Sequence, residues 1–355
     1  MDVAPSSTRK PDISIIGAGI AGLWQALTFA RAGHAVTLYE RGDASMAAGT
    51  SHWAGGMLAP WCEREAAEDV IVALGSRSLA LWRAALPDVA LDGSLVVAHS
   101  RDRADFERFA AMTDHHRRVD AAALAALEPA LEGRFREGLF FAGEGHVEPR
   151  RVMPVLRRLI AEAGAEIRFG AACEPGEIEG LAAGGWVIDC RGLAARDAAA
   201  PAPASGLRGV KGETVLVETS EISLSRPVRL LHPRWPLYVV PRAANRFLIG
   251  ATSIETEGTG VSLRSALELM SAAYALHPVF AEARIVELGA ALRPAFADNR
   301  PRIARDGRVV SVNGLYRHGF LIAPALAELT LALVAGEGAS PGILNQHPIL
   351  EEVLA

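Results

Sequence analysis

The sequence predicts an α/β fold in which a domain of β-α-β units is interleaved with an antiparallel-sheet domain. Residues 13–40 have the pattern of a buried strand, a glycine-rich turn, a helix and a second strand. Residues 212–252 form short β-type runs separated by turn residues. Residues 309–336 return to a strand, a turn and a helix. The first and last segments are therefore assigned to one Rossmann-type domain, and the middle segment to a second domain.

The remaining elements follow from the periodicity of apolar residues. Ala, Leu and charged residues recur at helical spacing over 66–86 and 103–128, with a strand expected at 93–99 between them. Residues 146–170 repeat the order of helix, glycine and strand found at the start of the chain. One further helix is expected over 262–276.

The composition indicates a folded protein and gives no sign of nucleic-acid binding. Of the 355 residues, 50% are hydrophobic and 22% are charged, which supports a large buried core and argues against disorder. The net charge is −5, and the arginines are scattered along the chain. No basic patch that would bind nucleic acid is therefore expected.

The cysteines and the apolar runs favour a cytoplasmic protein without a membrane span. The three cysteines form no C-x-x-C pair and lack zinc-ligand spacing, so neither a disulfide nor a metal site is expected. The polar first ten residues lack the apolar core of a signal peptide. The apolar run 320–336 is interrupted by Pro324 and Glu328, whereas a spanning helix needs about 20 apolar residues. We therefore expect a buried helix there.

The glycine-rich turn has the spacing of a dinucleotide-binding motif. Gly17 permits the tight turn, Gly19 lets the backbone approach a pyrophosphate, and Gly22 lets the helix pack close to the strand. Glu40 ends the next strand at the distance, roughly 20 residues, where a carboxylate accepts from ribose hydroxyls. The predicted nucleotide site also includes the adjacent residues Ile20, Ala21 and Arg41.

NAD and FAD share this motif, and two features favour FAD. The motif lies near the start of the sequence, so later elements can close over the nucleotide. The later strand 186–190 also runs into a glycine turn at Gly192, which could return to the same nucleotide. An ordinary core strand is the alternative interpretation of that second segment, and an NAD-dependent dehydrogenase remains open.

The loop at 49–63 combines glycines with bulky side chains. Gly55 and Gly56 expose backbone N–H groups that suit the close approach of a flat ring or a phosphate. Thr50 and Ser51 can donate to phosphate oxygens. The alternative is a surface loop held by the Met–Leu pair that follows the glycines.

Five segments are distinctive in sequence and order. They read AGGML, GHVEPRRV, PLYVVPR followed by RFLIGAT, ALRPAFADNRP, and GLYRHGFLIAPAL. Together they resemble the glycine oxidase branch of the D-amino-acid-oxidase family of flavoproteins, and their order and spacing fit that family over nearly the whole chain.

The resemblance implies a discontinuous FAD-binding domain over 11–80, 146–205 and 286–355. The substrate domain then comprises 81–145 and 206–285. FAD is expected to be bound noncovalently, although some relatives attach the flavin to a histidine in this loop, where this chain has a histidine at position 52.

The resemblance also assigns residues to the substrate and the flavin. Arg293 matches the arginine that holds the substrate carboxylate; the alternative is a structural ion pair with Asp298. Tyr238 matches the active-site tyrosine, and Arg317 a polar position near substrate and flavin. The last helix would direct its free N–H groups and positive dipole end at the flavin. Further flavin-binding residues are expected at Met57, Cys173, Gly192, His318, Gly319, Phe320 and Leu321.

The implied reaction is the FAD-dependent oxidation of glycine or a similar small amine. A hydride would pass from the substrate carbon to flavin N5, giving an imine, and molecular oxygen would be reduced to hydrogen peroxide. The imine from glycine could supply the thiazole ring of thiamine. Sarcosine or a D-amino acid could replace glycine, and a noncatalytic FAD-binding protein is a further alternative. A homo-oligomer is possible because family members are often multimeric.

Overall fold

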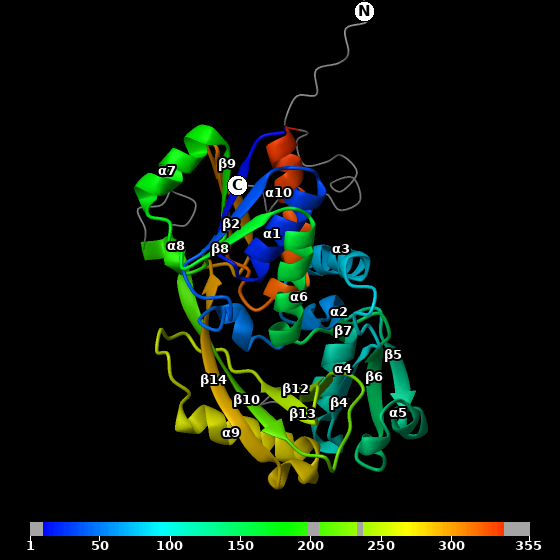
Figure 1. Cartoon of the computed structure of the whole chain (residues 1–355). Coiled ribbons are helices and arrows are strands. Elements are labelled where there is room, and N and C mark those ends of the chain that lie inside the picture. Colours follow the sequence, from blue (N-terminus) through cyan, green and yellow to red (C-terminus); the bar gives the residue numbers. More distant parts are fainter. Residues whose placement is uncertain (1–9, 198–205, 233–236, 337–355) are drawn as a thin grey trace, which may run out of the picture.

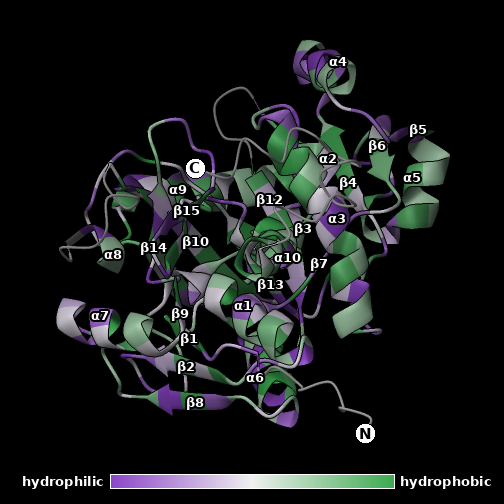
Figure 2. Ribbon diagram, turned by 90° about the horizontal axis from the view of Figure 1, so that it is seen from above, coloured by the Kyte–Doolittle hydropathy of each residue, from purple (hydrophilic) through white to green (hydrophobic). Residues whose placement is uncertain are grey.

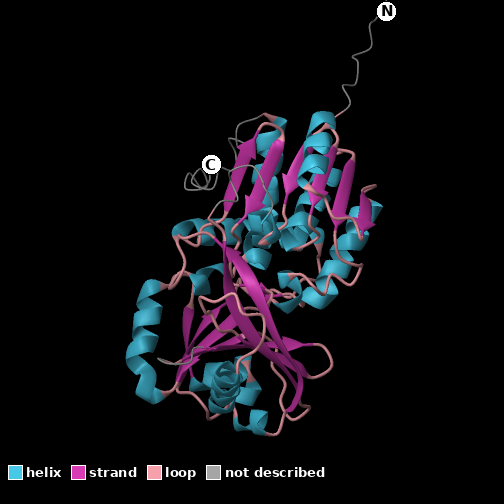
Figure 3. Cartoon of the chain, turned by 90° about the vertical axis from the view of Figure 1, so that its left-hand side faces the viewer, coloured by secondary structure: helices cyan, strands magenta, loops and turns pink. Residues whose placement is uncertain are grey.

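The computed structural model describes residues 10–197, 206–232 and 237–336, which form two lobes. A six-stranded sheet with its helices forms the upper lobe in Figure 1, and an eight-stranded sheet forms the lower lobe. Figure 3 shows the same two lobes from the side, and Figure 1 shows the long strands β10 and β14 of the lower sheet rising toward the upper lobe. The α/β prediction with two interleaved sheets is therefore confirmed.

The six-stranded sheet positions the glycine turn. Its order is β15-β16-β9-β1-β2-β8, and all neighbours run parallel except the β15–β16 pair. The carboxyl ends of the five parallel strands therefore lie at one edge of the sheet, where α/β folds bind their ligands. The strands are β1 (Ile13–Ile16), β2 (Val36–Glu40), β8 (Glu166–Phe169), β9 (Trp186–Asp189), β15 (Arg302–Asp306) and β16 (Val309–Asn313).

The last helix, α10 (Gly319–Ala335), lies in the middle of this lobe. Figure 2 shows it near the centre of the molecule with hydrophobic residues along it. Buried hydrogen bonds fix it to its neighbours: the Gln25 amide donates to Thr330 Oγ1 (3.0 Å), and the Trp82 indole donates to the Phe320 carbonyl (2.9 Å). The other helices of the lobe are α1 (Ile20–Arg31), α3 (Asp69–Ala85), α6 (Pro149–Glu162), α7 (Pro175–Gly184) and α8 (Ala194–Asp197). Within the described residues, no helix is long and apolar enough to cross a membrane.

The eight-stranded sheet has the order β14-β10-β13-β12-β11-β4-β6-β5. Its neighbours are antiparallel except for β4 and β11, which run parallel. Side chains from the sheet and from α9 (Leu263–Leu276) share one apolar core. The strands are β4 (Ser94–Ala98), β5 (Arg117–Asp120), β6 (Glu137–Phe141), β10 (Arg208–Glu218), β11 (Val228–Leu231), β12 (Leu237–Arg242), β13 (Arg246–Gly250) and β14 (Arg284–Ala295).

The single helix predicted over 103–128 is wrong. The chain instead forms α4 (Arg103–Met112), the edge strand β5 and α5 (Ala121–Leu127). The first helix ends because Thr113 is extended and its hydroxyl donates back to the Phe109 carbonyl (2.9 Å). Asp120 starts the second helix by accepting from the backbone N–H of Ala123 (2.9 Å).

The predicted domain boundary at residue 286 falls inside β14. This strand pairs with β10 along its length, so its hydrogen bonds belong to the eight-stranded sheet. We therefore propose that the last FAD-domain segment begins after Ala295. Residues 198–205 and 337–355, also assigned to that domain, lie outside the described residues.

Short elements connect the two lobes. The loop predicted at 49–63 contains the short strand β3 (Met57–Leu58), which pairs with β7 (Gly145–His146), and the single-turn helix α2 (Pro60–Glu63). The 3₁₀ turns lie at Thr50–Trp53, Ser100–Asp102, Pro129–Leu131 and Pro278–Ala281.

A buried carboxyl group anchors the start of α2. Glu144 Oε1 accepts from the backbone N–H groups of Trp61 (2.9 Å) and Cys62 (2.8 Å), which helix geometry leaves unpaired. The Ser94 hydroxyl donates to Glu144 Oε2. Burial raises the pKa of Glu144 to about 7. The position of α2 is thus fixed by groups from β4 and from the turn after β6.

We predict opposite effects for two glycine-to-alanine substitutions in helices. A Cβ at Gly22 in α1 would lie 1.8 Å from the Gly17 carbonyl oxygen, whereas one at Gly180 in α7 would meet no atom within 4 Å. Gly22→Ala should therefore lower the free energy of unfolding by about 1–3 kcal/mol. Gly180→Ala should raise it by up to about 1 kcal/mol, because alanine favours helix. Urea unfolding measures both, and equal effects would contradict the packing argument.

A second prediction concerns Glu144 and pH. In the folded protein this carboxyl stays protonated up to about pH 7, whereas in the unfolded chain it has its ordinary pKa of 4.5. Its contribution to stability is thus present below pH 4.5 and is lost as the pH rises through about 7. Relative to wild type, Glu144→Gln should gain roughly 3 kcal/mol in free energy of unfolding between about pH 4.5 and pH 8. A difference that does not change with pH would show that Glu144 is ionised throughout.

Candidate active site

One large cavity lies between the two sheets. Its volume is about 1130 Å³, above the range of about 300–1,000 Å³ that is usual for drug-sized ligands. Residues at the carboxyl edge of the six-stranded sheet line it on one side, and residues of β10, β12, β14 and α9 line it on the other. A dinucleotide together with a small second ligand fits such a space.

The glycine motif forms one wall of this cavity. Gly17 has a φ of +97°, and a Cβ there would lie 2.8 Å from the Cys190 carbonyl oxygen. Gly17 and Gly19 line the cavity. Gly22 does not; it lies against the Gly17 carbonyl, which matches its predicted packing role. The turn therefore brings the start of α1 close to the ends of β1 and β9.

Glu40 braces this turn from the end of β2. Its two carboxylate oxygens accept from the backbone N–H groups of Ala18 (2.7 Å) and Gly42 (2.8 Å). Each oxygen keeps a further lone pair, so the carboxylate can still accept from a ribose hydroxyl. The predicted neighbours that line the same part of the cavity are Ile20, Ala21 and Arg41.

The loop that contains the second pair of glycines also lines the cavity, with one correction to the predicted contacts. The Thr50 hydroxyl donates to the Leu292 carbonyl (2.9 Å), so its proton is not free for a phosphate. Ser51 Oγ accepts from the backbone N–H of Ile20 (3.0 Å) and keeps its own proton available. Gly55, Gly56 and Met57 line the cavity, whereas His52 is absent from its lining.

Arg293 and Tyr238 approach the cavity from the eight-stranded sheet. The Arg293 Nη1 donates to the Thr252 carbonyl (2.9 Å), and the guanidinium lies over Gly212, where a Cβ would be 2.1 Å from Nη2. Tyr238 lies over Gly55, where a Cβ would be 3.0 Å from the tyrosine hydroxyl. Burial lowers the pKa of Arg293, although an arginine stays protonated.

Arg293 does not form the structural ion pair considered as the alternative. Asp298 pairs with Arg302 instead (3.0 Å). Among the residues that the structure describes, no carboxylate lies within ion-pair distance of Arg293. Its charge is therefore available to an anionic ligand.

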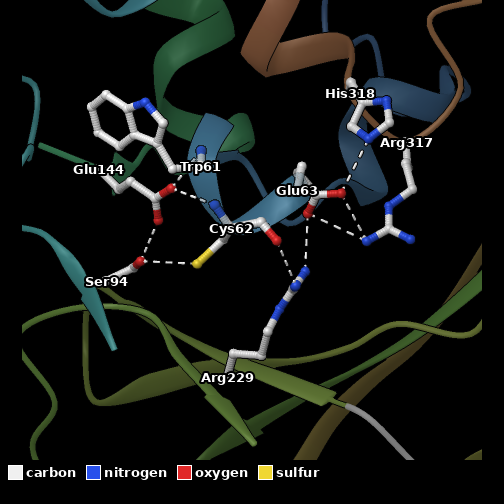
Figure 4. A network of polar contacts seen from close by, with 8 residues as sticks. All are labelled: Trp61, Cys62, Glu63, Ser94, Glu144, Arg229, Arg317 and His318. Atoms are coloured by element: carbon white, nitrogen blue, oxygen red, sulfur yellow. Dashed lines mark hydrogen bonds and ion pairs between the residues drawn. The ribbon is translucent and has the colours of Figure 1, made fainter. Parts of the chain in front are cut away.

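Arg317 and His318 meet a carboxylate that sequence reasoning missed (Figure 4). Glu63 Oε2 lies 2.9 Å from Arg317 Nη2 and 3.1 Å from His318 Nε2, while Oε1 lies 3.0 Å from Arg229 Nη2. Burial lowers the pKa of His318, so its imidazole is neutral at neutral pH. Glu63 stands six residues after the predicted Met57, but the sequence spacing gave no signal that pairs it with β11 and the turn before α10.

The start of α10 meets the cavity without a side-chain cap. Gly319, Phe320 and Leu321 line the cavity, and the N-cap residue His318 makes no capping hydrogen bond. The first N–H groups of a helix lack intrahelical partners, and the helix dipole makes this end positive. Cys173, after β8, and Gly192, after β9, also line the cavity as predicted. The Gly192 carbonyl accepts from the Asn313 amide (3.0 Å).

These groups fit FAD. Gly17 and Gly19 line the cavity, and so do the first residues of α1 and α10, whose backbone N–H groups suit an anionic group such as a diphosphate. Glu40 stands where a ribose would be held, and uncapped amides suit the polar edge of a flat ring. Gly17, Gly19, Glu40, Ser51 and the first turn of α10 would hold the cofactor.

Comparison with known proteins extends this likeness over nearly the whole chain. The family model described as FAD dependent oxidoreductase matches residues 12–333. A protein of Rhizobium etli named "Putative thiamine biosynthesis oxidoreductase ThiO" is 49% identical over 329 residues, which cover 92% of this chain and 97% of that protein. The glycine oxidase of Geobacillus kaustophilus is 28% identical over 364 residues, covering 92% of this chain and 93% of the relative.

The solved structures agree with these sequence comparisons. The crystal structure of glycine oxidase from Geobacillus kaustophilus superposes with a TM-score of 0.76 at 25% identity, covering 93% of this chain and 95% of that one. The geometry, the family model and the relatives agree, and the chain belongs to the family of FAD-dependent oxidoreductases.

Proposed function

We propose that this enzyme oxidises the amine of a small amino acid, glycine before others, and passes the electrons to molecular oxygen. The observation that carries the proposal is Arg293, a cavity arginine with no carboxylate partner among the described residues. The names of the relatives from Rhizobium etli and Geobacillus kaustophilus support glycine as the substrate and thiamine biosynthesis as the use of the product.

Arg293 is proposed to bind the substrate carboxylate. Its hydrogen bond to Thr252 fixes one edge of the guanidinium, and the remaining N–H groups can donate in parallel to two carboxylate oxygens. The Tyr238 hydroxyl and Arg317 would provide further donors around the same anion. Two positive charges and a hydroxyl thereby select an anionic substrate and fix its orientation.

Orientation is the main contribution that these residues can make to the rate. FAD, when bound, accepts the hydride that leaves the α-carbon of the substrate. Holding the carboxylate on Arg293 fixes that carbon in one position, which removes the entropic cost of finding it. The positive end of α10 stabilises the negative charge that arrives with the electrons.

Within the described residues, no cluster of His, Cys, Asp and Glu side chains could hold a metal ion.

The product would be the imine of the substrate, which water converts to ammonia and an oxoacid. We place the enzyme in the cytoplasm, in keeping with its three free cysteines. A homo-oligomer is in keeping with the exposed apolar side chains of Leu263 and Leu267 on α9.

Oxygen consumption with a panel of amines tests this function. Glycine should give hydrogen peroxide, ammonia and glyoxylate in equal amounts without added NAD. Faster turnover of sarcosine or a D-amino acid would change the substrate. Turnover that requires NAD, or none with any amine, would overturn the proposal.

Replacing Arg293 should weaken substrate binding strongly. Arg293→Ala removes two charge-assisted hydrogen bonds, so the apparent Michaelis constant for glycine should rise about 100-fold. The protein should keep its FAD and stay yellow, because Arg293 lies on β14 of the eight-stranded sheet, away from the glycine turn. Arg302→Ala, which removes an arginine paired with Asp298, should leave the constant unchanged. Wild-type turnover of glycine by Arg293→Ala would refute the assigned role.

Replacing Glu40 should weaken cofactor retention. Glu40→Ala removes the proposed ribose contact and also frees the N–H groups of Ala18 and Gly42, so the dissociation constant for FAD should rise at least about tenfold. Glu166→Ala on the neighbouring strand is the control, because that exposed carboxylate pairs only with Arg168 among the described residues. Fluorescence titration of the apoprotein measures both, and equal affinities would count against the ribose contact.

A further inference from the structure

We propose that Glu63 is a positioning residue for the substrate carboxylate, and that it acts by holding Arg317 at the cavity. This inference rests on the amino acid oxidation proposed above. It assigns to Glu63 no contact with the substrate itself.

The contacts of Glu63 join three segments of the chain. Glu63 ends α2, Arg229 belongs to β11 of the eight-stranded sheet, and Arg317 precedes α10. Arg229 reaches the same helix end twice, because its Nη1 also donates to the Cys62 carbonyl (3.0 Å). Figure 4 shows the carboxylate between the two arginines, with His318 beside it. Glu63 therefore connects the eight-stranded sheet to the turn that places Arg317 at the cavity.

The electrostatics make this acid a permanent anion. Burial alone would raise the pKa of Glu63, but Arg317, His318 and Arg229 hold the pKa well below its ordinary value. Glu63 is only 8% exposed, so water screens these contacts weakly. A charged pair in such surroundings holds its geometry more firmly than an ion pair at the surface.

The arrangement leaves one side of Arg317 available. Its Nη2 is held by Glu63, whereas its Nε and Nη1 have no hydrogen-bond partner among the described residues. The side chain remains 32% exposed and lines the cavity. Glu63 thus fixes one edge of the guanidinium while the other can donate to an anion.

The carboxylate itself is held firmly. Glu144 anchors the start of α2, one turn before Glu63, through the N–H groups of Trp61 and Cys62. Arg229 holds the other end of α2 through the Cys62 carbonyl and the Glu63 carboxylate. Without the Glu63 charge, Arg229 and Arg317 would repel each other across the gap, and Arg317 would lose its partner. It would then sample other rotamers, and the substrate carboxylate would lose a preoriented donor.

The test measures the binding of acetate, a carboxylate without an amine to oxidise, from the change that it causes in the visible spectrum of the FAD-loaded enzyme. Glu63→Gln keeps the shape and removes the charge, and the dissociation constant should rise about tenfold or more. Glu128→Gln is the matched control, because Glu128 is another buried acid paired with an arginine, Arg226 (2.9 Å), and it lies outside the cavity lining. Its dissociation constant should stay within about twofold of wild type.

A double-mutant cycle separates positioning from general support. In an Arg317→Met background, Glu63→Gln should change the dissociation constant for acetate less than about twofold, because the residue through which it acts is gone. Losses that add in full would show that Glu63 supports the site by another route and would overturn the inference.

A second variant, Glu63→Asp, separates the loss of position from the loss of the buried charge. Glu63→Asp keeps the charge that the two arginines need, but its shorter side chain cannot reach Arg229 and Arg317 together, so acetate binding should again weaken. Wild-type affinity in both Glu63 variants would overturn the role of Glu63 alone. A wild-type enzyme that neither binds acetate nor reacts with glycine would overturn the proposed function instead.

Discussion

The site depends on a contact that only glycine permits. The Gly17 carbonyl lies where a Cβ of Gly22 would be, and Gly17 itself lies against the backbone at Cys190. These two approaches bring the start of α1 to the carboxyl edge of the parallel sheet. Glu40 then closes the turn through the N–H group of Ala18. The free N–H groups of α1, the acid at the end of β2 and the turn after β9 consequently share one wall of the cavity.

The opposite wall of the cavity comes from the mostly antiparallel eight-stranded sheet. Buried ion pairs connect that sheet to the lobe of the parallel sheet. The eight-stranded sheet provides Arg293 and Tyr238, whose side chains lie over glycines of β10 and of the loop at 49–63. Glu63 joins that sheet to the turn before α10. Such buried ion pairs add little net stability, because desolvation offsets the attraction, but they specify geometry. Here the geometry is that of the substrate end of the cavity.

The sequence was most informative where a local pattern has one structural explanation. The glycine spacing, the acid at Glu40 and the buried last helix could all be predicted, because each depends on neighbouring residues. The network around Glu63 could not be predicted, because its members come from three segments that are distant in sequence. Nothing in the sequence singles out Glu63 from the other acids as the partner of Arg229 and Arg317. The same limit explains Thr50, whose hydroxyl binds a carbonyl of β14. The break after Met112 was missed because alanine and charged residues continue a helical pattern across it.

We propose that glycine, held by its carboxylate on Arg293, delivers electrons to FAD in this cavity. The most direct measurement is the visible spectrum of the purified protein under anaerobic conditions, before and after glycine is added. We expect an oxidised flavin spectrum that glycine bleaches and that air restores, with formation of peroxide. A flavin spectrum that glycine leaves unchanged would contradict it, and so would a protein that binds no flavin.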